Sequence, residues 1–241
     1  MSIEIRGLTK RYKDVTAVDS VDLDIKTGEL FALLGLNGAG KTTIIKMLCG
    51  LTLPDSGTAH ILGNSVTENL GEVKKIIAIS PQETSVAPNL TVLENLRLMC
   101  GANGFSKEKT AEKSAEMLQK LALSEVSGKK ASKLSGGYMR RLSIAMALIS
   151  EPKVLFLDEP TLGIDVLARA ELWELIKGLK GDMTVILTTH YMEEAERLSD
   201  RVGIMKSGKL IAVGTAEELK AKAGAEKFED AFVKIVKGAE I

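Results

Sequence analysis

The sequence predicts an α/β fold with a mixed-sheet core, an N-terminal antiparallel β subdomain and an inserted helical subdomain. Three observations predict this fold. Continuous apolar runs, typical of strands buried on both faces, occur at 30–34, 154–157 and 185–187. Near the start of the chain, apolar and polar residues alternate instead, as they do in strands with one exposed face. Between Thr91 and Ile149 the apolar residues recur at helical spacing.

Local signals place further elements in chain order. A fourth buried strand is predicted at 76–79, because an apolar run there ends at Ser80-Pro81. Thr91 and Glu94 form a capping-box pattern, which indicates the start of a helix. Two further helices in this segment are predicted from the apolar sets Ala111, Ala115, Leu118, Ala122 and Leu142, Ala145, Met146, Ile149.

The last part of the chain predicts a helix, a hairpin and a helical tail. A helix is expected at 192–198, followed by strands at 202–205 and 209–213 around a turn at 206–208. Thr215 and Glu218 form a second capping pattern. Phe228 and Phe232 lie one helical turn apart, which predicts a final helix.

Composition excludes several classes of protein. The chain has 241 residues, of which 45% are hydrophobic, so it is neither disordered nor too short for a sizeable core. Lys+Arg and Asp+Glu both total 32, and without a basic excess no nucleic-acid partner is expected. No apolar run approaches the ~20 residues needed to cross a bilayer. The absence of a signal-peptide pattern and of a disulfide framework leads us to expect a cytoplasmic protein.

A glycine-rich segment follows the first buried run and precedes a predicted helix. Residues 35–42 read GLNGAGKT, which fits the phosphate-loop pattern G-x-x-x-x-G-K-[ST]. Glycines let backbone N–H groups converge on phosphates, while Lys41 reaches the β- and γ-phosphates and the Thr42 hydroxyl ligates Mg²⁺. By itself the loop does not separate a kinase from a GTPase or a transport ATPase. The predicted nucleotide-binding residues here are Gly35, Leu36, Asn37, Gly38, Ala39, Gly40, Lys41, Thr42 and Thr43.

Two acids end the buried run at 154–157. Ligands of open α/β sheets bind at the carboxyl edge of the strands, where Asp158 and Glu159 are expected to lie. There Asp158 would hold Mg²⁺, and Glu159 would take the proton from a water attacking the γ-phosphate. An ordinary polar strand end is the alternative interpretation. The phosphate loop in the same chain favours the catalytic one.

A second small-residue loop, Leu134-Ser135-Gly136-Gly137, precedes the helix that contains Leu142. A helix N-terminus of this kind is a second anion site, and one nucleotide rarely needs two. A second copy of the chain would account for both anion sites, because the second site of each copy would then bind the nucleotide held by the other copy. With these motifs in this order, the chain resembles the ATP-binding cassette (ABC) ATPases, a P-loop NTPase family, over nearly its whole length.

The resemblance implies roles for residues outside the phosphate loop. Tyr12 would stack on adenine, and Gln82 would contact Mg²⁺ and the attacking water. His190 would contact the γ-phosphate, as would Ser135 and Gly137 of the opposite subunit, with Gly136 between them. The alternatives are a surface tyrosine, a solvated glutamine and a structural histidine. The implied catalytic residues are Lys41, Gln82, Glu159 and His190, and the implied metal ligands are Thr42, Gln82 and Asp158.

The resemblance also implies a domain organisation and partners. A single domain would cover 1–241, with a nucleotide-binding core at 1–85 and 151–214, a helical subdomain at 86–150 and a tail at 215–241. Segments such as 135–141 and 189–196 look like the drug- and polymer-exporter branch. The partners would be a polytopic membrane permease and a second ATP-binding subunit, at the inner face of the cell membrane. The cofactors would be ATP and Mg²⁺.

Other functions remain open at this point. An importer ATPase has the same motifs, and a soluble ABC-type ATPase of DNA repair or translation shares them as well. The chain has one cassette, no heptad run and no Cys/His metal spacing, which disfavours the soluble class. A catalytically idle module is disfavoured because the predicted catalytic residues are all present. Tyr138 departs from the family, many members of which have glutamine there.

Overall fold

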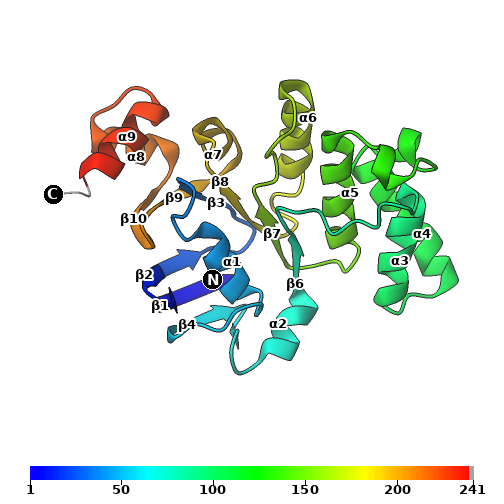
Figure 1. The fold of residues 1–241 in the computed structure, drawn as a ribbon, viewed down its shortest axis with the longest axis horizontal. Helices are drawn as coiled ribbons and strands as arrows, with labels where there is room; N and C mark the ends of the chain where they lie inside the picture. Colours follow the sequence, from blue (N-terminus) through cyan, green and yellow to red (C-terminus); the bar gives the residue numbers. More distant parts are fainter. Residues whose placement is uncertain (239–241) are drawn as a thin grey trace.

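The computed structural model describes residues 1–238 and contains two β-sheets surrounded by helices (Figure 1). The smaller sheet is antiparallel and has the strand order β2-β1-β4-β5. Its strands are β1 (Ile3–Tyr12), β2 (Val15–Ile25), β4 (Ser56–Ile61) and β5 (Asn64–Ser65). The predicted N-terminal antiparallel subdomain is therefore confirmed.

The larger sheet has the order β10-β9-β3-β8-β7-β6. Strands β9, β3, β8, β7 and β6 run parallel, and β10 pairs antiparallel with β9, so the predicted mixed sheet is confirmed. The strands are β3 (Leu30–Gly35), β6 (Ile77–Ser80), β7 (Val154–Asp158), β8 (Thr184–Thr189), β9 (Arg201–Lys206) and β10 (Lys209–Gly214). Strand β6 begins one residue later than predicted, because Ile76 is the last residue of a helix.

The larger sheet is buried on both faces because alternate residues of its strands enter different cores. In β3, Leu30 and Leu34 pack in the core with the helices, whereas Phe31 and Leu33 pack in the core with the smaller sheet. Strand β7 divides in the same way, with Leu155 on one side and Phe156 on the other. This arrangement explains why these strands read as continuous apolar runs.

Helices cover the larger sheet and form a separate group beside it (Figure 1). The helices of the inserted segment are α3 (Val92–Ala102), α4 (Lys107–Lys120) and α5 (Gly136–Leu148), which lie at the right of the view. Short 3₁₀ turns at Ser124–Val126 and Ala131–Lys133 connect α4 to α5. The other helices are α1 (Lys41–Leu48), α2 (Leu70–Ile76), α6 (Val166–Lys177), α7 (Met192–Leu198), α8 (Ala216–Ala223) and α9 (Phe228–Gly238).

Both predicted capping boxes form, at Thr91 and Glu94 on α3 and at Thr215 and Glu218 on α8. The apolar stripe predicted for α4 is wrong except at Leu118, which packs against the core. Ala111 and Ala115 are exposed. The buried side of α4 consists of Lys113, Ser114 and Met117 instead. Ala122 lies beyond the helix with a φ of 51°. No helix of residues 1–238 is long and apolar enough to cross a bilayer.

Candidate functional site

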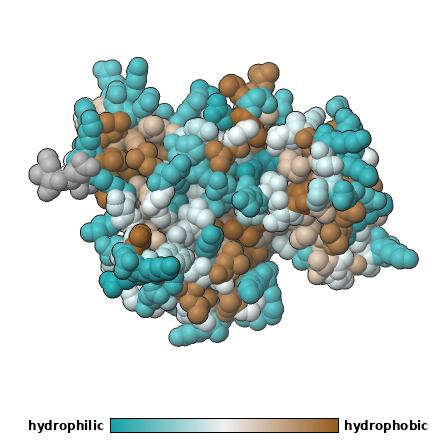
Figure 2. Space-filling model, viewed as in Figure 1, coloured by the Kyte–Doolittle hydropathy of each residue, from teal (hydrophilic) through white to brown (hydrophobic). Residues whose placement is uncertain are grey.

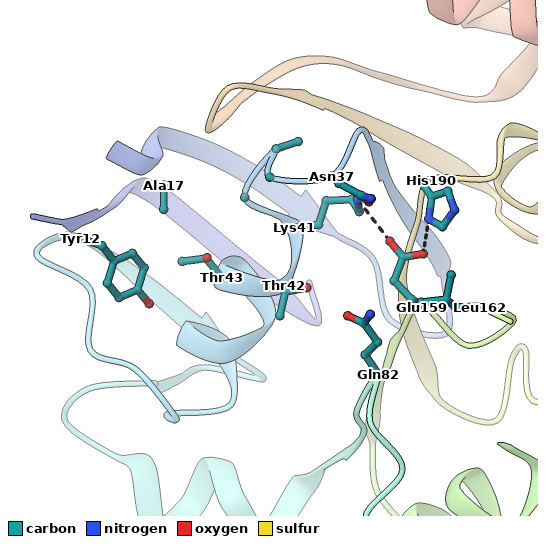
Figure 3. Close-up of a pocket in the computed structure, with 13 residues that line it drawn as sticks. Tyr12, Ala17, Asn37, Lys41, Thr42, Thr43, Gln82, Glu159, Leu162 and His190 are labelled. Atoms are coloured by element: carbon teal, nitrogen blue, oxygen red, sulfur yellow. Dashed lines mark hydrogen bonds and ion pairs between the residues drawn. The ribbon is translucent and has the colours of Figure 1, made fainter. Parts of the chain in front are cut away.

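A cavity of about 420 Å³ opens at the carboxyl edge of the larger sheet (Figure 3). Its volume lies within the ~300–1,000 Å³ range of small-molecule sites. The loop between β3 and α1 forms one wall. The residues that line it are Tyr12, Ala17, Asn37, Gly38, Ala39, Gly40, Lys41, Thr42, Thr43, Gln82, Glu159, Leu162 and His190. The cavity thus brings together residues that are far apart in the sequence, and all of them except Ala17 and Leu162 were predicted to share one site.

The loop before α1 has the geometry of a phosphate cradle. Gly40 caps the helix with a φ of 102°, and no side chain within residues 1–238 caps the α1 N-terminus. A Cβ on Gly40 would lie 2.3 Å from the Ala17 carbonyl oxygen, so only glycine fits there. The first N–H groups of α1 therefore face the cavity as an anion site. The Leu36 side chain is exposed and does not line this cavity.

Lys41 is nearly fully buried and connects the loop to Glu159, the residue after β7. Its Nζ donates to the carbonyl oxygens of Gly35 at 2.8 Å and of Leu36 at 3.3 Å. The same Nζ lies 3.3 Å from Oε1 of Glu159. A buried ammonium needs such partners, because desolvation of an unpaired charge is very unfavourable. The structure therefore positions the charge of Lys41 at the floor of the phosphate loop.

Glu159 links Lys41 to His190. Its second carboxylate oxygen, Oε2, lies 2.7 Å from Nδ1 of His190 (Figure 3). The Glu159 backbone has a φ of 49°, a left-handed conformation that costs a non-glycine residue about 1–3 kcal/mol. The Glu159 N–H donates to the carbonyl oxygen of Thr188 at 3.2 Å and to its Oγ1 at 3.0 Å. These bonds to β8 hold the strained residue, and with it the carboxylate, in place.

Asp158 and Thr42 provide oxygen atoms suited to Mg²⁺. Oδ1 of Asp158 accepts hydrogen bonds from Thr42 Oγ1 at 3.0 Å and from Thr188 Oγ1 at 2.5 Å. The Gln82 side chain enters the same cavity from the segment after β6 (Figure 3). Hydroxyl, carboxylate and amide oxygens are the ligands that Mg²⁺ prefers, and magnesium sites use only a few protein ligands. The residues present therefore fit the predicted magnesium site.

Tyr12 lies at the other side of the cavity, across the phosphate loop from Glu159 (Figure 3). Its side chain is half exposed, and the Lys10 ammonium lies 5.5 Å from its ring centroid. An exposed ring face at the rim of a cavity can stack on a flat aromatic ligand. The position of Tyr12 is therefore compatible with the predicted adenine contact.

The predicted signature residues do not line this cavity. Ser135 is the exposed N-cap of α5, and no side-chain hydrogen bond within residues 1–238 caps this helix. A Cβ on Gly137 would lie 2.8 Å from the Cβ of Ala168, so glycine permits close packing of α5 on α6. Tyr138 lies over the Arg141 guanidinium at 5.3 Å. The structure thus presents a second, separate helix N-terminus to solvent.

Comparison with known proteins identifies the family. A family profile described as "ABC transporter" matches residues 18–162, which include the phosphate loop, the signature and both acids. The chain belongs to the ABC transporter family. A profile described as "AAA domain, putative AbiEii toxin, Type IV TA system" matches the shorter range 131–194. The family resemblance expected from the motifs is therefore confirmed.

Relatives within the ABC family align with most of this chain. The probable multidrug ABC transporter ATP-binding protein YbhF of Escherichia coli is 41% identical over 97% of the chain, which spans 41% of YbhF. The daunorubicin/doxorubicin resistance ATP-binding protein DrrA of Streptomyces peucetius is 40% identical, with 92% of this chain and 68% of DrrA covered. A dimeric post-hydrolysis state of the ATP-binding cassette MJ0796, bound to ADP and Pi, superimposes with a TM-score of 0.80. Its identity is 27%, with 88% of this chain and 98% of that chain covered.

Two buried charged residues near the phosphate-loop cavity were not predicted to be buried from the sequence. Arg140 of α5 and Glu194 of α7 are nearly inaccessible to solvent. Arg140 stands beside Arg141 in the α5 sequence, and nothing in that pair indicates that both side chains are buried. Glu194 lies in an acidic run, at 193–196, that reads as a solvated helix face, so no sequence signal distinguished it.

Glu194 is fully buried next to the segments that contain Glu159 and His190. Its Oε1 accepts a hydrogen bond from Nε1 of Trp173 at 3.1 Å, while its Oε2 has no hydrogen-bond partner within residues 1–238. Burial raises the pKa of this carboxyl above the ordinary value of 4.5 and outweighs the hydrogen bonding, including that from Trp173, which lowers it; the nearby charge of Glu159 adds to the increase. The folded protein therefore binds a proton at Glu194 under conditions in which the unfolded chain releases it.

Glu194→Gln is expected to remove part of the pH dependence of stability. Between the ordinary pKa of 4.5 and the raised folded pKa, the native state holds more protons, so wild-type stability falls as pH rises. Glutamine stays neutral and retains an oxygen for Trp173. We expect the variant to melt roughly 2–4 °C above the wild type near pH 8 and the gap to close toward about pH 5. Thermal unfolding across this range measures the effect, and a gap that widens on acidification would contradict it.

Proposed function

We propose that this chain is the Mg-ATP-binding and hydrolysing subunit of a transporter, and that two copies close around two ATP molecules. One observation carries the proposal: within the phosphate-loop cavity, Glu159 contacts both the buried Lys41 ammonium and the partly exposed His190 ring. Structural ion pairs do not require a carboxylate on a strained backbone beside a helix N-terminus. A site for transfer of the γ-phosphate to water can use each of these groups.

In the proposed mechanism, each side chain has a defined role. The α1 N-terminus and Lys41 hold the β- and γ-phosphates, and Tyr12 stacks on the base. Glu159 takes the proton of the attacking water, and His190 holds the Glu159 carboxylate and contacts the γ-phosphate. Thr42, Asp158 and Gln82 would hold Mg²⁺, which when bound neutralises charge on the β- and γ-phosphates. The remaining phosphate-loop residues, Gly35 to Ala39 and Thr43, shape the cradle.

The exposed start of the signature, at Ser135 and Gly136, supports a partnership between two subunits. Ser135, Gly136 and Gly137 form an uncapped helix N-terminus outside the cavity, and in the proposed closed state they contact the nucleotide of the second subunit. Large apolar side chains are exposed on the phosphate loop, at Leu36, and in the first turn of α6, at Val166 and Leu167. Figure 2 shows a hydrophobic area over α6 at the top of the view. Burial of such side chains against a second subunit, identical or related, would stabilise the closed state.

We further propose that ATP hydrolysis powers export through a separate membrane permease, with this chain at the cytoplasmic face of the membrane. Support comes from the names of the relatives, which include multidrug and drug-resistance ATP-binding proteins. We divide the domain into a core at 1–85 and 151–214, a helical subdomain at 86–150 and a tail from 215. The last residues of that predicted tail, 239–241, lie outside the described part of the chain.

A pull-down from detergent-solubilised host membranes tests the transport proposal. Tagged Glu159→Gln protein, held with Mg-ATP, is expected to retain a polytopic membrane protein in stoichiometric yield. Tagged Lys41→Ala protein is the matched control and should recover less, because it cannot close on ATP. Recovery of ribosomes or DNA-bound proteins alone would favour a soluble ABC-type ATPase of translation or DNA repair. Recovery of an importer permease would support the proposed ATPase function but would contradict the proposed export.

A further inference from the structure

Two adjacent arginines of α5 point to different neighbours. Arg140 and Arg141 are both nearly fully buried. Arg140 donates from Nη1 to the carbonyl oxygen of Pro81 at 2.7 Å and from Nη2 to that of Gln82 at 2.9 Å. Arg141 forms an ion pair with Glu171 of α6 instead. Arg140 thus binds two consecutive carbonyls of the segment that carries Gln82, a geometry suited to the rigid guanidinium fork.

A second contact fastens α5 to the same segment. One helical turn after Arg140, the hydroxyl of Ser143 lies 2.8 Å from that of Ser80, the last residue of β6, and both side chains are buried. The side of α5 that bears Arg140 and Ser143 therefore contacts three consecutive residues, from Ser80 to Gln82. The N-terminus of the same helix is the signature, with Ser135 as its N-cap.

The Gln82 side chain lines the cavity, whereas its carbonyl oxygen is held by Arg140. The backbone position of Gln82 therefore depends on α5, while its amide group lies among the catalytic residues. Displacement of α5 relative to the sheet must move Gln82, break the Arg140 hydrogen bonds, or both. Either event changes how the Gln82 amide is placed beside Thr42 and Glu159.

We propose that Arg140 is a positioning residue that couples the signature helix to Gln82, so that hydrolysis depends on where α5 lies. This inference rests on the proposed ATPase function and on the role assigned to Gln82 in it. Arg140 also interacts with the charges of Asp158, Glu159 and Glu194, and a purely structural role would be to offset them. The test must therefore separate action through Gln82 from general stabilisation.

A double-mutant cycle separates an effect of Arg140 through Gln82 from general stabilisation of the protein. Arg140→Gln is expected to lower kcat for phosphate release about 10-fold in the wild type, with the KM for ATP changed less than about twofold. In a Gln82→Ala background the same change should lower the residual kcat less than about twofold. Arg141→Gln, on the same helix and equally buried, is the matched control, and its effect on kcat should be the same in both backgrounds. Equal losses from Arg140→Gln in both backgrounds would overturn the proposal.

Arg140→Lys keeps the charge but not the fork, and it covers the case in which Arg140→Gln does not fold. We expect its kcat to lie closer to that of Arg140→Gln than to the wild-type value. Recovery to the wild-type value would show that charge alone suffices and would overturn the proposal.

Hydrogen–deuterium exchange provides a readout that does not require activity. The coupling predicts that Arg140→Lys raises amide exchange at 82–86 about 10-fold and leaves exchange in α1 unchanged. Unchanged exchange at 82–86 would overturn it. If the wild type released no phosphate, the proposed function would fail, while the exchange experiment would still decide whether Arg140 holds this segment.

Discussion

Glu159→Gln is expected to lower ATP turnover by ~100- to 10,000-fold while ATP binding is retained. Glutamine keeps the shape of the side chain but cannot take a proton from the attacking water. It also removes the negative charge 3.3 Å from Lys41, which leaves that ammonium free to interact with phosphate. The variant should therefore accumulate as a closed pair of chains with bound ATP, at roughly twice the 25.9 kDa mass of one chain.

Phosphate release and sedimentation with Mg-ATP measure these two effects. Glu193→Gln is the matched control, because Glu193 lies nearby but its half-exposed side chain pairs with Arg197. This control should retain wild-type turnover. Turnover near the wild-type rate in Glu159→Gln would remove Glu159 from its proposed role.

Lys41→Ala is expected to weaken ATP binding by at least ~100-fold. The ammonium is buried at the floor of the phosphate loop, so its removal takes away the one Lys or Arg charge that lines the cavity within residues 1–238. It also leaves the carbonyl oxygens of Gly35 and Leu36 without this donor, which loosens the loop. Two defects thus act in the same direction.

Titration with a fluorescent ATP analogue measures the loss. Lys46→Ala is the matched control, because Lys46 lies on the same helix but is exposed. The control should bind with the wild-type Kd. An unchanged affinity in Lys41→Ala would contradict the assignment of this loop as the phosphate site.

Much of the fold could be predicted because its strands are unambiguous. Runs such as 30–34 and 154–157 alternate between two cores, and only a sheet covered on both faces permits this. The helix α4 was predicted, but its buried side was not, because alanines are small enough to lie on either face. There the aliphatic stem of Lys113 is buried, and its ammonium forms ion pairs with Glu116 and Glu151.

The members of the site could be predicted from motifs, but their contacts could not. Motifs indicate which residues share an edge of the sheet, since parallel strands end together there. They do not indicate that Glu159 has a left-handed backbone, because that follows from its hydrogen bonds to Thr188 on another strand. The contacts of Arg140 and Glu194 likewise depend on the packing of α5 and α7, which no local pattern specifies.

Phosphate release across a range of chain concentrations tests whether two copies of the chain hydrolyse Mg-ATP together. If each active site needs the signature of a second chain, the rate per chain should rise with concentration and level off where dimers predominate. It should also require Mg²⁺. A rate per chain that stays constant down to concentrations at which sedimentation detects only monomers would show that hydrolysis does not depend on a second copy of this chain, and no release at any concentration would show that two copies of this chain do not hydrolyse Mg-ATP together.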